Sequence, residues 1–213
     1  MSKSNAYKYG VDQSNYIHRA REMLLRDEAQ SLFYAAYELR CYVEIRQEQY
    51  LNAQRKYVRS IPRHHKIGAQ GRALRDIMSE QRIQSIKWSV AGGKHLDMYY
   101  VPVRDELRKN AEKLGELLHA QKHYRGAEDR WWQEKRSFLL DTFELAWTCS
   151  KGNMLSPALF SNGQALGTVS FTATFPVENI PTIHAGQKGL MHVDYLEQAP
   201  EEWFKDDDLI GRC

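Results

Sequence analysis

An arginine and a histidine lie five positions apart in the most basic stretch of the chain, Arg59-Ser-Ile-Pro-Arg-His64. An imidazole can move the proton of a ribose 2′-hydroxyl, and a guanidinium can hold a phosphate through two parallel hydrogen bonds. Such a pair suits the cleavage of RNA without a metal ion. The alternative interpretation is a solvated basic loop between two helices, because short patterns of this kind also arise by chance.

The charge around this pair points to a polyanionic partner. Residues 55–75 contain seven Lys/Arg, two histidines and no acidic residue. The whole chain has a formal net charge of +3, but residues 151–213 hold four Lys/Arg against eight Asp/Glu. The basic excess therefore belongs to residues 1–150, and a field of that sign attracts phosphate polymers without fixing a sequence preference. The side chains that we expect to contact RNA are Arg55, Lys56, Arg63, Lys66 and Arg72.

Two further pairs of residues are of types that could take part in catalysis or binding. Arg40 and Glu44 are four positions apart in a predicted helix and therefore face the same side. Glu44 would orient the guanidinium by accepting its hydrogen bonds; the alternative is a surface ion pair worth a few tenths of a kcal/mol. Gly115 precedes His119 by one predicted helical turn, so that a ligand or another backbone can approach the imidazole, or two helices can cross closely.

The sequence lacks the patterns of other site classes. The three cysteines are far apart without a CxxC pair, and we find neither four clustered zinc ligands nor GxSxG, HExxH, Walker A or GxGxxG patterns. The single ExxH at residues 116–119 cannot form a di-iron site, which needs two copies. We expect no metal and no cofactor. With no run near 18 apolar residues and no apolar core at the start, we expect a cytoplasmic protein without membrane contact.

Hydrophobic periodicity predicts a mainly α fold. Helical patterns cover residues 14–58, with a break near 26–28, and then residues 70–88, 102–123 and 127–149. Strict alternation predicts a strand over 168–175, and Met191, Val193 and Tyr195 indicate a second strand. We therefore expect an antiparallel bundle of four or five helices in residues 1–150. A small C-terminal β-hairpin-like appendage with an acidic tail follows in residues 151–213.

Two predicted helices resemble those of a known family. Residues 29–44, in which alanines and aromatic residues precede Glu38-Leu-Arg40 and Glu44, resemble the second helix of HEPN-type proteins. Residues 114–120 are similar to a later helix of some HEPN-like proteins, and the likeness spans about residues 14–148. The resemblance implies an all-α bundle that dimerises. In active members an Arg-x(4–6)-His motif from each subunit meets in a cleft at the interface and cuts RNA without metal.

Arg59 and His64 fit the spacing of that motif, although Pro62 lies inside it and Ser60 stands where the family frequently has Asn. Arg40 and His119 are the alternative pair, if packing brings their helices together. The predicted function is a metal-independent endoribonuclease, acting as a toxin or antiphage effector with an antitoxin or defence-system partner. The alternative is a non-catalytic dimeric module that binds nucleic acid or an acidic protein.

Overall fold

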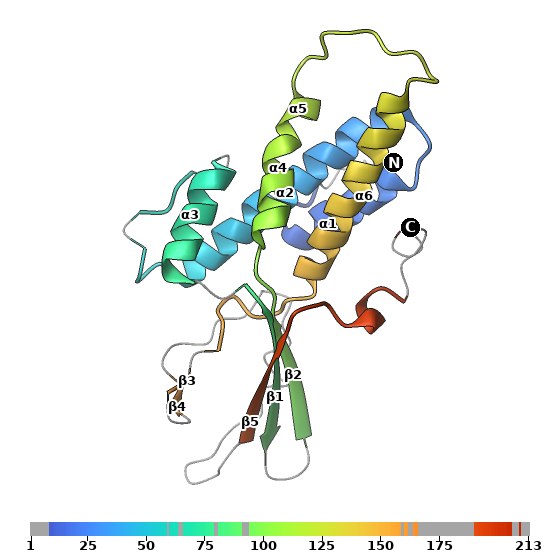
Figure 1. Ribbon diagram of the computed structural model, residues 1–213. Helices are drawn as coiled ribbons and strands as arrows, with labels where there is room; N and C mark the ends of the chain where they lie inside the picture. Colours follow the sequence, from blue (N-terminus) through green and yellow to red (C-terminus); the bar gives the residue numbers. More distant parts are fainter. Residues whose placement is uncertain are drawn as a thin grey trace, which may run out of the picture.

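Helices form most of the structure. The computed structural model describes residues 9–58, 60–63, 66–78, 81–90, 94–158, 160–161, 164–165, 190–205 and 209. Within these residues the long helices are α1 (Gln13–Leu24), α2 (Ala29–Ala53), α3 (Ile67–Ile77), α4 (Asp105–Lys113) and α6 (Arg130–Ser150). A helix of four residues, α5 (Gly115–Leu118), follows α4. The prediction of a mainly helical protein is confirmed (Figure 1).

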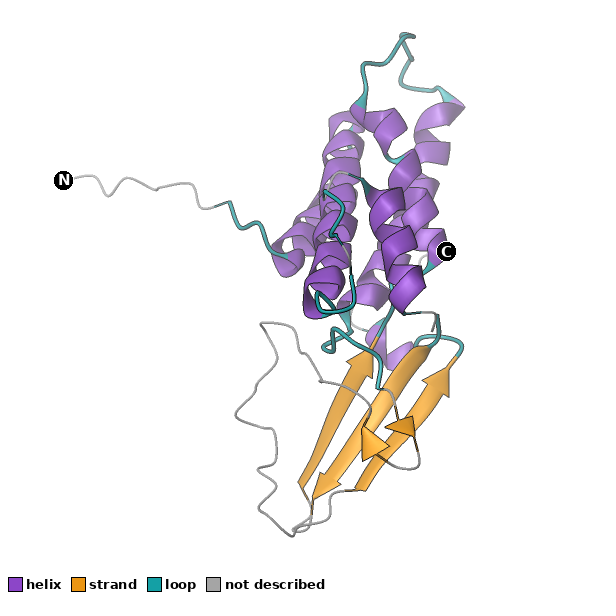
Figure 2. Cartoon of the chain, turned by 90° about the vertical axis from the view of Figure 1, so that its left-hand side faces the viewer, coloured by secondary structure: helices purple, strands orange, loops and turns teal. Residues whose placement is uncertain are grey.

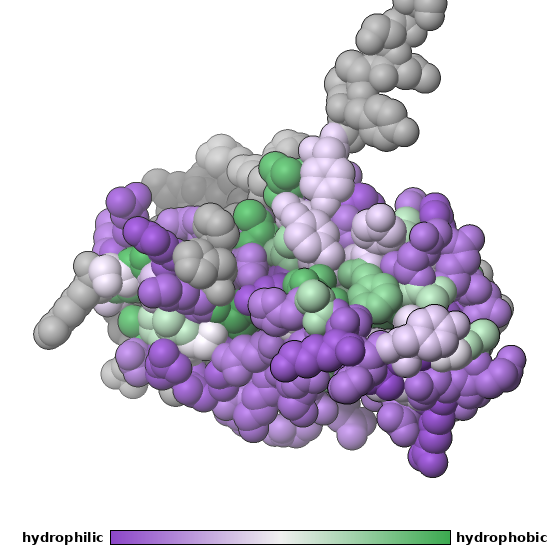
Figure 3. Space-filling view, turned by 90° about the horizontal axis from the view of Figure 1, so that it is seen from above, coloured by the Kyte–Doolittle hydropathy of each residue, from purple (hydrophilic) through white to green (hydrophobic). Residues whose placement is uncertain are grey.

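Helix α2 is the centre of the bundle. It contacts α1, α3, α4, α5 and α6. The helical pattern predicted for this segment places Leu32, Leu39 and Val43 on one face, and all three are buried in the bundle core, whereas Ala29 at the start of the helix is exposed. Viewed from above, the visible hydrophobic residues form a central band between hydrophilic ones (Figure 3). Across the described residues, no helix combines the length and apolar character that a membrane crossing requires.

The first and the last helix begin and end near their predicted positions, and the second begins near its predicted start. The break expected near residues 26–28 separates α1 from α2. Asp12 caps α1 by accepting a hydrogen bond from the Asn15 backbone N–H at 2.9 Å. Asp129 caps α6 in the same way, accepting from the Trp131 backbone N–H at 2.9 Å. A side-chain oxygen at the cap satisfies an N–H that has no partner within the helix.

A three-stranded antiparallel sheet projects from one end of the bundle (Figures 1 and 2). Its strands are β1 (Ile83–Val90), β2 (Lys94–Tyr100) and β5 (Leu190–Leu196), in the order β2-β1-β5. The β5 strand confirms the one expected at residues 191–195, but it pairs with mid-chain β1, so the sheet is not confined to the C-terminal part as expected. The sheet thus spans the predicted boundary at residue 150. The strand expected at 168–175 lies outside the described residues; β3 (Phe160–Ser161) pairs with β4 (Gln164–Ala165).

The helix predicted over residues 70–88 is wrong in its second half, where the chain forms β1. Close to the bundle, both faces of this strand are buried. Ile83 belongs to the bundle core, whereas Ile86 belongs to a second cluster that we call the sheet core, between α2, α3 and the sheet. A strand buried on both faces loses its alternating pattern, and periodicity alone cannot distinguish it from a buried helix.

The helix predicted over residues 102–123 is also shorter than expected. It begins only at Asp105 and divides at Leu114 into α4 and α5, the second of which ends at Leu118. Residues 119–129 instead form an exposed connection to α6, which rises above the bundle in Figure 1. His119 therefore lies just beyond the end of a helix rather than within one.

Candidate nucleic-acid interface

The basic stretch forms the connection between α2 and α3. We call residues 54–66 the basic connection; it begins where α2 ends at Ala53, five residues before the expected end at Val58. Hydrogen-bonded turns shape it at both ends: the Tyr57 N–H donates to the Gln54 carbonyl at 2.8 Å, and the Lys66 N–H donates to the Arg63 carbonyl at 2.9 Å. It runs along the outer side of the molecule beside α3 (Figure 1).

Apolar side chains fasten the basic connection to the fold. Val58 and Ile61 pack against the sheet core. The fully buried Gln70 on α3 donates from its side-chain amide to the Pro62 carbonyl at 3.5 Å. Because these residues are held from within, the charged residues between them remain at the surface.

The predicted RNA-contacting side chains lie on the solvent side of this region. All of them are exposed, and no ion pair joins them to a carboxylate within the described part of the chain: Arg55, Lys56, Arg63, Lys66 and Arg72. Arg75 differs, because its Nη1 pairs with Asp105 Oδ2 at 2.9 Å. Exposed cations that no carboxylate pairs with leave a positive field at the surface.

Close packing against α4 sets the position of α3. A Cβ atom at Gly71 would overlap Cδ of Arg108, and one at Gly68 would come within 2.5 Å of Glu112 Oε1. The largely buried Arg108 pairs with Asp105 at 3.1 Å, and beside Arg75 it lowers the pKa of that carboxyl, although burial acts to raise it. Helix α3 thus packs through Gly71 on the side chain of Arg108, which its ion pair holds in place. The residue after Gly71, Arg72, is exposed to solvent.

The predicted catalytic pair within the basic connection is not among the residues that the structure describes. Arg59 and His64, with the neighbouring His65, lie outside the described residues. Their flanking residues, Val58 and Lys66, are described. The spacing of the pair therefore remains a prediction from the sequence.

The alternative pair, Arg40 and His119, has separate surroundings. Arg40 Nε pairs with Glu44 Oε1 at 3.1 Å, as the four-residue spacing predicts, and its Nη1 donates to the Ala111 carbonyl at 3.4 Å. A Cβ at Gly115 would lie 3.2 Å from that same Nη1, so the glycine makes room for Arg40 rather than for an approach to the imidazole. His119 is exposed beyond α5, and among the described residues no hydrogen bond or ion pair joins it to Arg40.

A buried arginine is the main residue whose role the sequence does not reveal. Arg46 is fully buried, and its Nη2 donates to the carbonyls of Gly152 at 2.7 Å and Cys149 at 3.4 Å, at the C-terminal end of α6. The guanidinium carbon also lies 4.6 Å from the centre of the Tyr50 ring. Burial acts to lower the pKa of Arg46, but Tyr50 and Cys149 raise it above its ordinary value. The cation thus satisfies carbonyls that a helix end leaves without partners.

A second network that the sequence does not predict holds Tyr9 against α1 and α2. Glu38 Oε2 pairs with Arg19 at 2.9 Å, and its Oε1 accepts a hydrogen bond from the Tyr9 hydroxyl at 2.9 Å. The Arg19 guanidinium carbon lies 3.9 Å from the centre of the Tyr9 ring. Burial, the hydrogen bond to Glu38 and its charge raise the pKa of Tyr9 to about 12. These contacts give Glu38 a structural role, as the acceptor that holds Tyr9 and Arg19 together.

The fold also contains a cavity of about 280 Å³ near the end of α6. Leu107, Leu145 and Phe204 are among its lining residues. The nearby Arg104 is held by the carbonyls of Gln81 at 3.2 Å and Glu197 at 2.9 Å. The volume lies just below the roughly 300–1,000 Å³ of typical ligand pockets. The exposed basic surface is therefore the stronger candidate site.

Searches of protein-family models, curated proteins and solved structures found no match to this chain. The resemblance of residues 29–44 and 114–120 to HEPN proteins thus stays a prediction. Among the described residues no group of three or more His, Cys, Asp or Glu side chains has the proximity needed to hold a metal ion.

Proposed function

We propose that this protein binds RNA through the basic connection and the exposed side of α3. One observation carries the proposal: residues 55–75 contain no acidic residue, and five of their cations are exposed without a carboxylate partner among the described residues. Each phosphate that a cation neutralises releases condensed counterions, which is the main driving force for binding a polyanion. A solvated loop with compensated charge would lack that driving force.

The exposure of these side chains favours a long polyanion over a small phosphate ligand. A small anion is held by convergent donors in a concave site, whereas these cations come from two successive turns and from an adjacent helix on the outside of the molecule. A backbone that carries regular charges can follow such a surface. An acidic protein segment is the competing polyanion, and the experiment below separates it from RNA.

Cleavage of the bound RNA is our second proposal, and the spacing of Arg59 and His64 supports it. Both residues belong to the same basic segment, so RNA bound there would lie beside them. In this scheme His64 takes the proton of the 2′-hydroxyl, the 2′-oxygen bonds to phosphorus to form a 2′,3′-cyclic phosphate, and the P–O5′ bond breaks as the leaving 5′-oxygen gains a proton from water. Arg59 stabilises the charge that develops on the phosphate. Arg40, Glu44 and His119 would then have no part in the reaction, since Arg40 is engaged with the Ala111 carbonyl beside Gly115.

A two-subunit arrangement completes the proposal. The HEPN resemblance implies that copies of the motif from two chains share one cleft, which a single chain cannot form. Light scattering of the purified protein at rising concentration tests this expectation. A monomer at all concentrations would contradict the shared-cleft mechanism while leaving RNA binding open to its own test.

The binding proposal is tested by fluorescence anisotropy with labelled RNA at low salt. Arg55→Glu combined with Lys56→Glu reverses two charges within the basic connection. Lys122→Glu combined with Arg130→Glu makes the same change at exposed positions beyond α5 and at the start of α6. We expect the first variant to bind at least tenfold more weakly and the second to bind as the unchanged protein does. Equal losses in both variants would reject the basic connection as the RNA site. No RNA binding at low salt would reject RNA as the partner and favour an acidic protein.

Cleavage is tested with the same RNA in EDTA. We expect products that disappear with Arg59→Ala and His64→Ala and persist with His119→Ala. Loss of cleavage with His119→Ala alone would identify the other pair as catalytic. RNA that is bound without being cut would leave a binding module.

A further inference from the structure

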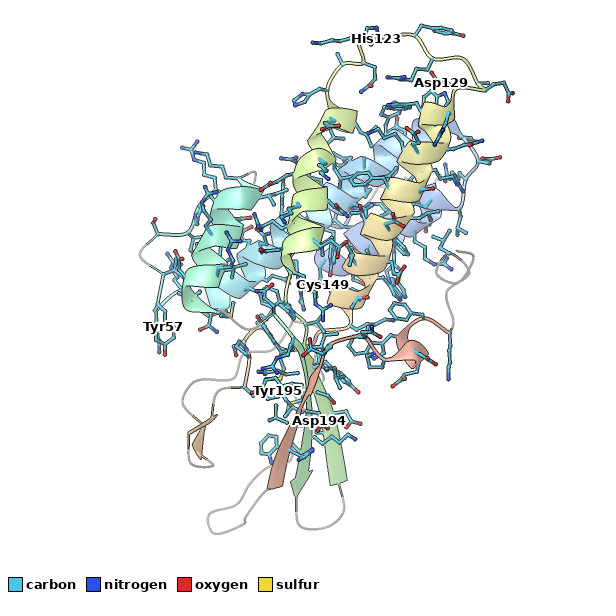
Figure 4. The ribbon with its side chains drawn as sticks, in the orientation of Figure 1. Tyr57, His123, Asp129, Cys149, Asp194 and Tyr195 are labelled. Carbon is cyan, nitrogen blue, oxygen red and sulfur yellow. The ribbon has the colours of Figure 1, made fainter. Side chains whose placement is uncertain are left out.

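Tyr57 is a large aromatic side chain at the surface of the basic connection. Its relative exposure is 67%, and it directly follows the exposed Arg55 and Lys56. Figure 4 shows it at the outer edge of the molecule below α3, away from the bundle. A flat ring beside several cations presents a π face where a nucleic-acid backbone would be held.

The backbone at this position is fixed although the ring is exposed. The Tyr57 N–H donates to the Gln54 carbonyl at 2.8 Å, and the next residue, Val58, packs against the sheet core. The ring thus projects from an anchored turn rather than from a free end. An anchored platform loses less conformational entropy when a ligand covers it.

We propose that Tyr57 stacks on an unpaired base, so that the basic surface selects single-stranded over duplex RNA; this inference rests on the proposed function. Stacking on an aromatic ring requires an accessible base face, which a duplex keeps within its own stack. The cations hold the phosphates of either form, but only a single strand can place a base on the ring. The preference therefore resides in Tyr57 and the overall affinity resides in the charges.

The other exposed tyrosines supply a matched control. Tyr34 is 61% exposed and lies in the same helix, α2, that leads into the basic connection. Gln54 follows Tyr34 by twenty positions, which corresponds to roughly 30 Å along the helix axis. Tyr34→Ala thus removes an equally exposed ring at a distance from the proposed RNA site.

The experiment compares binding of a labelled single-stranded RNA with binding of the duplex that it forms with its complement. We expect the unchanged protein to prefer the single strand. Tyr57→Ala should weaken single-strand binding about tenfold, within the range known for base–aromatic stacking, and leave duplex binding unchanged. Tyr57→Phe should keep the preference, because the ring face remains, and Tyr34→Ala should change neither affinity.

The outcomes separate this inference from the proposed function. Failure of the unchanged protein to bind either RNA rejects the function and the inference together. RNA binding that Tyr57→Ala leaves unchanged, or weakens equally for both forms, overturns the inference alone. Circular dichroism of each variant checks the fold, which an exposed side chain should not alter.

Discussion

Two glycines in α3 give a sharp test of how the fold holds the basic surface. Gly71 and Gly68 both face α4, but they meet different parts of it. A Cβ at Gly71 would overlap Cδ of Arg108 and lie 2.8 Å from its Nε. A Cβ at Gly68 would come too close to one atom, Glu112 Oε1 at 2.5 Å, the far end of a side chain that is 46% exposed, and would make ordinary contact with Arg72 Nη1 at 3.7 Å.

The two substitutions to alanine should therefore differ in sign. In a helix alanine is favoured over glycine by about 1 kcal/mol. At position 71 this gain is offset by an overpacking cost of about 1–3 kcal/mol, because Arg108 is only 10% exposed and its ion pair with Asp105 at 3.1 Å restricts its movement. Gly71→Ala should thus destabilise the protein by up to about 2 kcal/mol, whereas Gly68→Ala should stabilise it by up to about 1 kcal/mol, since Glu112 can rotate into solvent.

Urea unfolding followed by circular dichroism measures both free energies of unfolding. A double-mutant cycle with Arg108→Ala isolates the contact, because removing that side chain should abolish the cost of Gly71→Ala. The reasoning fails if Gly71→Ala is as stable as Gly68→Ala, or if the cost at position 71 persists without Arg108.

Three further predictions concern the buried arginine, an acidic residue and the proposed interface. Arg46→Met should lower the free energy of unfolding by about 2–4 kcal/mol in urea unfolding, because the Gly152 and Cys149 carbonyls lose a buried donor; an unchanged stability would contradict this role. Burial acts to raise the pKa of Asp105, but Arg108 and Arg75 lower it below the ordinary value of 3.8. The ionised carboxylate therefore stabilises the folded protein above pH 3.8, and this contribution is lost as the pH falls through the lowered pKa. The unfolding temperature should fall less between neutral and acid pH in Asp105→Asn than in the unchanged protein. An equal fall in both proteins would contradict this role of Asp105. RNA affinity should fall steeply with salt and less steeply after Arg72→Ala, by about one unit in the slope of log affinity against log salt; a slope independent of Arg72 would exclude it from the contacts.

The helices that pack along one face could be predicted from sequence, whereas elements buried on two faces could not. Leu32, Leu39 and Val43 repeat at helical spacing and lie in the bundle core, so α2 follows from periodicity. Strand β1 was not predictable in the same way, because Ile83 and Ile86 enter different cores and so remove its alternation. The pairing of β5 with β1 depends on a contact between residues about a hundred positions apart, which no local pattern records.

The features of the candidate site also divide into those that the sequence predicts and those that it does not. Exposure of Arg55, Lys56 and Arg72 follows from charge, since an unpaired cation is costly to bury. The group that lies against Gly115 could not be predicted, because a glycine in a helix indicates a close approach without identifying what approaches. In the structure it is the guanidinium of Arg40. Arg46 is a charged residue within the apolar pattern of α2, and only its hydrogen bonds at the end of α6 explain its burial.

Ultraviolet cross-linking followed by mass spectrometry tests most directly whether the basic connection and α3 bind RNA. RNA that contains a photoreactive uridine analogue would be bound at low salt, irradiated and digested, and the cross-linked peptides identified. We predict cross-links within residues 54–75, with Tyr57 among the modified residues, and their loss when Arg55→Glu and Lys56→Glu are combined. Cross-links confined to the sheet or to residues 119–129, with none in residues 54–75, would contradict the account.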